Sequence, residues 1–229
     1  MTVAGARGSV WKDFKAGVVY DVVPKHVRDI KAKEWVDRTS AANLRHTAVL
    51  GGVAPFSHTL WATAVQADIP QAANSSVTAD GAAWIWNLAH DLFPDSVQIV
   101  DWYHACEHLA QASHALYPDD EQAAQRWYSS AKNHLFLDEV FHVIHSLLQA
   151  GLDHLAHYFQ THQRRMHYHL FPEEGHPIGS GSVECEIKQF KARLTGPSMC
   201  WSRLAAQRML VIRGAILVET FDDLWSLAA

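Results

Sequence analysis

The stretch SVTADGAAWIWNLAHDLFPDSVQIVD, residues 76–101, decides the fold class of this chain. Ser76–Ala79 is a short β-prone run, and Val97–Val100 is an apolar run typical of a buried strand. Residues 82–93 between them are typical of a helix, which Pro94 closes. A strand, a helix and a second strand in this order indicate an α/β domain.

The segments on either side extend this pattern. Strands are expected at residues 15–23 (KAGVVYDVV), ending before Pro24, and at 46–50 (HTAVL), followed by a helix at 54–67. The later chain is rich in helix formers, and its helices are expected at 103–117, 120–134, 138–150, 152–168, 182–194 and 203–218. A loop, FPEEGHPIGSG, occupies 171–181. The outline is therefore an α/β sheet domain with an all-α insertion.

Composition narrows the class of protein. The 229 residues are 48% apolar, which is typical of a folded globular chain. No apolar run is long enough to span a bilayer, and the first residues do not resemble a signal peptide. Three cysteines without a CxxC pair favour a reducing compartment, so we expect a cytoplasmic protein without membrane contact.

The net charge of −5 argues against a nucleic-acid partner, but its distribution does not. Residues 185–213 carry six basic side chains and one acid, a local charge of +5. Such a segment is compatible with phosphate contacts and equally with a solvated helix surface. The candidate DNA-contacting residues are Lys188, Lys191, Arg193, Arg203 and the neighbouring Trp201.

Three acidic residues lie directly after a predicted strand or a glycine-rich bend. Asp80 and Asp101 each follow a predicted strand, where ligands of open α/β sheets bind. Asp-Gly is also a common turn and Asp a common helix cap, so each has a purely structural explanation. Glu184 lies in the first turn of a helix after a glycine-rich bend, where the helix dipole also favours it. Carboxylates of this kind suit Mg²⁺ and phosphoryl transfer.

Three blocks resemble a known family in their order and content: DGAAWIW (80–86), DWYHACEHL (101–109) and PIGSGSVE (177–184). They are similar to the signature blocks of ISKra-type insertion-sequence transposases, within the Mutator-like DDE group. Supporting matches are WKDFKAGVVY (11–20), RMHY (165–168) and MCWS (199–202). The resemblance covers nearly the whole chain.

This resemblance implies a ribonuclease-H-like core in residues 1–103, an all-α insertion in 104–175, and C-terminal helices in 176–229 that complete the core. It implies that Asp80 and Glu184 are catalytic and hold Mg²⁺ or Mn²⁺, two ions in the intact enzyme. Asp101 and His104 would support the site. The implied activity is cleavage and strand transfer at insertion-sequence ends, with transposon and target DNA as partners and a homo-oligomer possible.

One element of the family pattern is missing. The first catalytic aspartate should lie on the first strand, ahead of the block at 11–20, and nothing acidic precedes Asp13. In such a sheet the first strand is central, flanked by the second and fourth. We therefore expect that strand to be missing and the 229 residues to be an incomplete fragment, inactive in strand transfer.

Two alternatives stay open. His104, Glu107 and His108 match the HxxEH pattern of zinc peptidases, with two histidines on one helix face. The chain could also be a non-catalytic DNA-binding remnant of a transposase. Other histidine pairs at helical spacing, such as His142 and His145, are interpreted as surface or packing residues.

Overall fold

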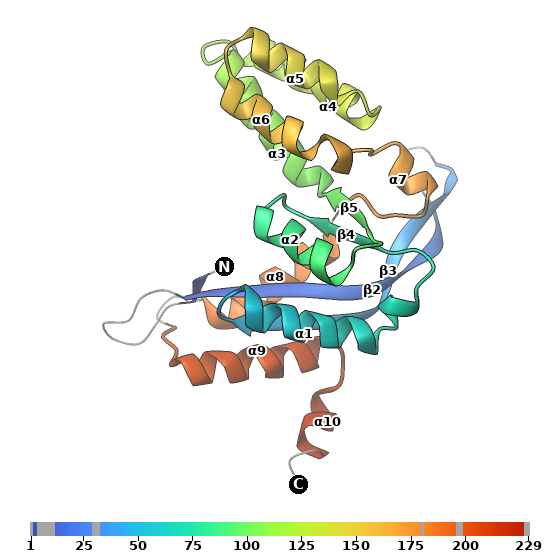
Figure 1. The fold of residues 1–229 in the computed structure, drawn as a ribbon, viewed down its shortest axis with the longest axis vertical. Helices are drawn as coiled ribbons and strands as arrows, with labels where there is room; N and C mark the ends of the chain where they lie inside the picture. Colours follow the sequence, from blue (N-terminus) through green and yellow to red (C-terminus); the bar gives the residue numbers. More distant parts are fainter. Residues whose placement is uncertain (1, 4–11, 29–32, 180, 196–198, 227–229) are drawn as a thin grey trace. The chain divides into compact units, whose positions relative to one another are not determined.

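The computed structural model describes residues 2–3, 12–28, 33–179, 181–195 and 199–226. It is a mixed α/β chain, as the sequence predicts, and it divides into two compact units (Figure 1). We name residues 1–73 with 181–229 the hairpin unit, and residues 74–180 the helical unit. The all-α segment expected at 104–175 lies inside the helical unit, together with the two strands at 76–79 and 97–100.

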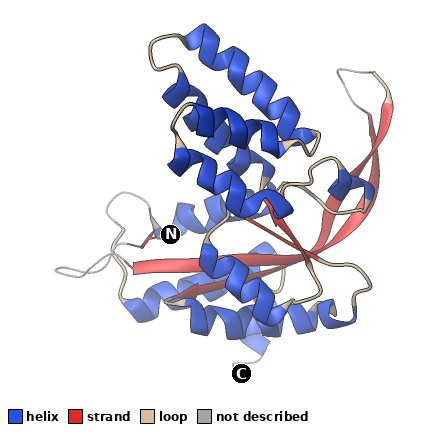
Figure 2. Cartoon of the chain, turned by 45° about the horizontal axis from the view of Figure 1, so that its top comes forward, coloured by secondary structure: helices blue, strands red, loops and turns tan. Residues whose placement is uncertain are grey.

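The hairpin unit is built on a long antiparallel ribbon, drawn as the two long red strands in Figure 2. Its strands are β2 (Lys12–Arg28) and β3 (Trp35–Leu50), paired from Phe14 opposite Leu50 to Arg28 opposite Trp35. A two-residue strand, β1 (Thr2–Val3), pairs antiparallel with the start of β2.

Both long strands exceed their predicted bounds. β2 was expected to end before Pro24, but Pro24 is paired opposite Thr39 and the strand continues to Arg28. Proline is tolerated here because, in the described residues, β2 pairs only with β3 at this point, and its other edge needs no N–H donor. β3 begins at Trp35 rather than at residue 46. Residues 35–45 lack the alternation of apolar and polar residues typical of a strand, and cross-strand pairing overrides this local pattern.

Three helices pack against this ribbon: α1 (Val53–Gln66), α8 (Gly181–Leu194) and α9 (Arg203–Leu217). A 3₁₀ turn (Ile69–Gln71) follows α1, and α10 (Phe221–Ser226) follows α9. Phe14 of β2 meets Phe190 of α8 edge to face, with ring centroids 6.3 Å apart. The backbone N–H of Leu50 donates to Oε1 of Gln207 on α9, at 2.8 Å. The C-terminal helices thus pack on the N-terminal ribbon, as their buried apolar residues require.

The helical unit begins with residues 74–101, which include the strand–helix–strand stretch at 76–101. β4 (Ser76–Ala79) and β5 (Val97–Val100) have the predicted bounds and pair in parallel, with α2 (Ala83–Leu92) as the crossover. The helices that follow are α3 (Trp102–Leu116), α4 (Glu121–Phe136), α5 (Val140–Gln149), α6 (Asp153–His162), a 3₁₀ turn (Gln163–Arg165) and α7 (Leu170–Glu173). Within the described ranges, no helix is both long and apolar enough to cross a bilayer.

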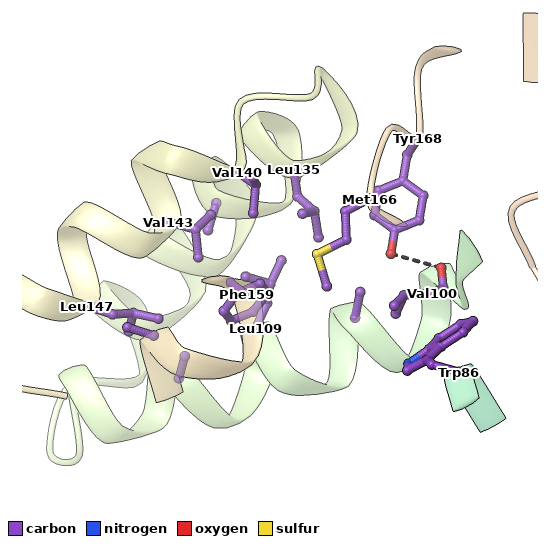
Figure 3. Packing of buried hydrophobic residues seen from close by; sticks show 14 residues of the cluster. Trp86, Val100, Leu109, Leu135, Val140, Val143, Leu147, Phe159, Met166 and Tyr168 are labelled. Carbon is purple, nitrogen blue, oxygen red and sulfur yellow. Dashed lines mark hydrogen bonds between the residues drawn. The ribbon is translucent and has the colours of Figure 1, made fainter. Parts of the chain in front are cut away.

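Figure 3 shows the core of the helical unit, where side chains from β5 and from α3 to α6 meet. Leu109, Leu135 and Leu147 are fully buried, and Phe159 is 1% exposed. The buried hydroxyl of Tyr168 donates a hydrogen bond to the carbonyl oxygen of Val100 at 3.0 Å, which fixes the end of β5. This core holds the strand ends that carry the candidate site.

Candidate functional site

Asp80 and Asp101 occupy neighbouring positions at the carboxyl ends of the paired strands β4 and β5. Ala79 and Val100 are register partners, and the backbone N–H of Asp101 donates to the carbonyl of Ala79 at 2.8 Å. Asp80 and Asp101 therefore follow paired residues on neighbouring parallel strands. This is the edge where open α/β sheets bind ligands, as the sequence predicted for both residues.

The two carboxylates differ in their surroundings. Asp101 is 3% exposed and caps α3, because its Oδ1 accepts from the backbone N–H of His104 at 2.9 Å. Asp80 is exposed, and its Oδ1 accepts from the N–H of Ala82 at 3.0 Å. Within the residues that the structure describes, the second oxygen of Asp80 accepts no hydrogen bond. Asp101 is thus built as a support and Asp80 is available as a ligand.

Helix α6 brings two further residues to Asp80 that the sequence analysis did not single out. A Cβ at Gly81 would lie 3.3 Å from Cε2 of Tyr158 and 3.4 Å from Nε2 of His162. Gly81 also has φ +100°, a conformation that favours glycine. The turn after Asp80 is therefore covered closely by Tyr158 and His162. Because Tyr158 and His162 are far from Asp80 in the sequence, no motif spacing predicts that they lie near it.

Tyr158 is the buried polar group of this site. Its hydroxyl is buried and has no hydrogen-bond partner among the described residues. Burial, and then the negative charges of Asp80, Asp101 and Glu107, raise the pKa of Tyr158 far above its usual value. The phenol is therefore neutral in the physiological range and offers an O–H donor beside Asp80.

His162 is 6% exposed and favours its neutral form. Burial lowers its pKa, and Arg165, His108 and His157 lower it further. Nη1 of Arg165 lies 3.5 Å from Nδ1 of His162, and since a guanidinium only donates, that ring nitrogen accepts. A neutral imidazole with its proton on Nε2 fits both observations.

The lowered pKa of His162 predicts that acid destabilises the helical unit. In the unfolded chain a histidine has a pKa of about 6.5, whereas in the folded unit the pKa of His162 is lower, so the unfolded state binds a proton more readily. The contribution of His162 to stability is therefore fully present above about pH 6.5, and it is lost as the pH falls toward the lower pKa of the folded state. Thermal unfolding midpoints between pH 7 and pH 5 should fall less in His162→Gln than in the wild type. A pH profile unchanged by His162→Gln but flattened by the exposed control His157→Gln would contradict this assignment.

His104 and His108, the histidines of the HxxEH pattern, are engaged separately. Nδ1 of His104 lies 3.3 Å from the carboxylate of Glu107. The ring of His108 stacks on Tyr158, with centroids 3.6 Å apart and an angle of 22°. The two histidine rings are 6.1 Å apart and nearly perpendicular. His108 thus packs on Tyr158, while His104 contacts the site through its backbone N–H, which donates to Asp101.

The predicted basic residues lie on the hairpin unit. Lys188, Lys191 and Arg193 are exposed on α8, and Arg203 is exposed at the start of α9. Trp201 is half-buried and packs against the core cluster around Phe14 and Leu210, a position that suits packing better than base stacking. The four cations can reach phosphate from the surface.

Glu184 lies in the first turn of α8, as predicted, but its side chain is outside the described part of the structure. The described donors for a hard cation are thus the carboxylates of Asp80 and Asp101. Their oxygen chemistry fits Mg²⁺ or Mn²⁺, with Asp80 the better ligand because one of its oxygens is uncommitted. Comparisons with protein-family models, with curated proteins and with solved structures find no match to this chain.

Proposed function

We propose that this chain is part of the catalytic core of a DDE-type DNA transposase, in which Asp80 and Glu184 hold Mg²⁺. The observation that carries the proposal is the placement of Asp80. It is an exposed carboxylate that ends a parallel strand, next to a buried aspartate that ends the neighbouring strand. That edge is where the family resemblance requires the second catalytic aspartate, and where α/β sheets place their ligands.

The strand pairing supports the ribonuclease-H-like reading. On either side of its central first strand, such a sheet has an antiparallel pair and a parallel pair of strands. The described residues form these two groups, β2 with β3 and β4 with β5. β1 pairs antiparallel with β2, as the family's first strand would, but it spans only Thr2 and Val3 and carries no carboxylate.

The residues around Asp80 have separable roles in the proposed chemistry. Mg²⁺ held by the carboxylates would activate a water or 3′-hydroxyl and neutralise charge at the leaving oxygen. The Ala82 N–H orients the Asp80 carboxylate through Oδ1 and leaves the other oxygen for the ion. Asp101 fixes the start of α3. Tyr158 and His162 pack against the Asp80–Gly81 turn.

DNA binding by the exposed cations of α8 gives a test of the partner. Each phosphate contact contributes a slope of about 0.9 to the logarithmic dependence of affinity on salt. The double variant Lys188→Gln, Lys191→Gln should therefore bind duplex DNA more weakly and lower the slope by about 2. Fluorescence anisotropy at several salt concentrations measures both quantities.

The matched control is the double variant Arg126→Gln, Arg164→Gln, which removes two exposed cations from the helical unit. We expect its affinity and slope to equal those of the wild type. Equal losses in the control and in the α8 variant would mean that binding follows net charge alone. Such a result would remove α8 from the proposed DNA-binding surface.

A further inference from the structure

The turn between α4 and α5 brings together two histidines and a glutamate. His134 lies in the last turn of α4, Glu139 immediately precedes α5, and His142 lies in its first turn. One potential ligand atom from each lies within 4.8 Å of the other two. Nδ1 of His134 is 2.7 Å from Oε2 of Glu139, and the two imidazole rings have centroids 4.5 Å apart.

The backbone of this turn holds the three residues in place. The N–H of Glu139 donates to the carbonyl of His134 at 2.8 Å, and the N–H of Asp138 to that of Leu135 at 3.4 Å. These two bonds, with Asp138 at φ +63°, form a Schellman closure of α4. The N–H of His142 then donates to the carbonyl of Glu139 at 3.1 Å, which links the third residue to the same turn.

Two further anchors keep the turn rigid. Oδ1 of Asp138 accepts from the backbone N–H of His169 at 3.2 Å, so the left-handed residue is tied to a distant segment. Leu135 and Val140, on either side of the turn, are 0% and 8% exposed and belong to the core of the helical unit. The side chains of His134 and Glu139 remain partly exposed, at 35% and 41%, and an ion could reach them from solvent.

We propose that His134, Glu139 and His142 form a zinc-binding site that clamps the end of α4 to the start of α5. Two imidazole nitrogens and one carboxylate are a donor set of zinc sites, whereas Mg²⁺ prefers oxygen ligands alone. A tetrahedral zinc ion with bonds of about 2.0–2.2 Å holds its ligand atoms roughly 3.4 Å apart. Small side-chain rotations bring the three groups to that spacing. The site uses no residue of the Asp80 edge and is independent of the proposed DNA chemistry.

The proposal specifies which histidines matter in a chain that has sixteen of them. Zinc titrated into the chelator-treated full chain should bind with one equivalent at the high-affinity site, measured by calorimetry. His142→Ala and Glu139→Gln should each weaken that binding by at least about tenfold. His142 is exposed, so its replacement leaves the core intact. The visible absorption of bound Co²⁺ should be lost in the same two variants.

Three matched controls should retain the site. His145→Ala removes an exposed histidine one turn further along α5. Glu121→Gln removes the carboxylate that lies 3.8 Å from His114, a histidine–glutamate pair outside the three-residue group. His104→Ala disrupts the HxxEH pattern. Zinc binding lost in His104→Ala and kept in His142→Ala would overturn the proposal, as would equal affinity in all variants or no high-affinity equivalent in the wild type.

Discussion

Asp80→Asn should abolish strand transfer at insertion-sequence ends. Asparagine keeps the oxygen that accepts from the Ala82 N–H, so the turn survives, but the charge that would hold Mg²⁺ is gone. Loss of a catalytic ion removes several kcal/mol of transition-state stabilisation, and about 4 kcal/mol corresponds to about a thousandfold in rate. The measurement is a gel assay of strand transfer with terminal-repeat DNA.

This test needs a chain with all three carboxylates. The family resemblance asks for a third carboxylate besides Asp80 and Glu184. The wild-type reference is therefore a protein that supplies this carboxylate and gives measurable strand transfer in the same assay. Asp120→Asn is the matched control, because Asp120 likewise accepts a backbone hydrogen bond, from Ala123 at 2.9 Å, but lies at the start of α4. Activity that survives Asp80→Asn, or that Asp120→Asn removes equally, would contradict the assignment.

Phe159→Ala should lower the free energy of unfolding of the helical unit by about 3–5 kcal/mol. Phe159 is 1% exposed, and it lies in the cluster that joins β5 to the helices (Figure 3). Its removal deletes a large apolar side chain and leaves a cavity that the neighbouring leucines fill only in part. Urea unfolding followed by circular dichroism measures the loss.

Phe141→Ala is the matched control for core burial. Phe141 is on α5 and is 59% exposed, so its replacement should change the free energy of unfolding by no more than about 0.5 kcal/mol. Similar losses in the two variants would mean that the helical unit is not organised around this core. The same result would remove the rigid support that the Asp80 edge requires.

The fold could be predicted where local pattern and tertiary environment agree. Ser76–Ala79 is a short β-prone run and Val97–Val100 a short apolar run, and both strands have the predicted bounds. Residues 35–45 mix apolar and polar residues without a strand-like alternation, and pairing with β2 makes them a strand. Pro24 suggested a strand end, although proline is acceptable on a strand with a free edge. These two errors lie in elements whose structure depends on a distant partner. The expected loop at 171–181 also contains the end of the short helix α7, and the helix expected at 152–168 ends at His162.

The candidate site shows the same division. The positions of Asp80 and Asp101 at strand ends follow from sequence alone, and the structure confirms these positions. Tyr158 and His162 reach Asp80 through the packing of α6, for which the sequence carries no signal. His134, Glu139 and His142 converge across a helix–helix turn. Helical spacing relates histidines within one helix only, so it does not indicate ligands that a turn brings together.

In the proposed active site, Asp80 and Glu184 hold the same divalent ion. A crystal structure of the chain grown with Mn²⁺ tests this most directly, because anomalous scattering locates the ion without reference to the protein. We predict an anomalous peak bound by the Asp80 carboxylate and by the Glu184 carboxylate. A peak at only one of these side chains, or at neither when Mn²⁺ is saturating, would contradict the proposed catalytic site.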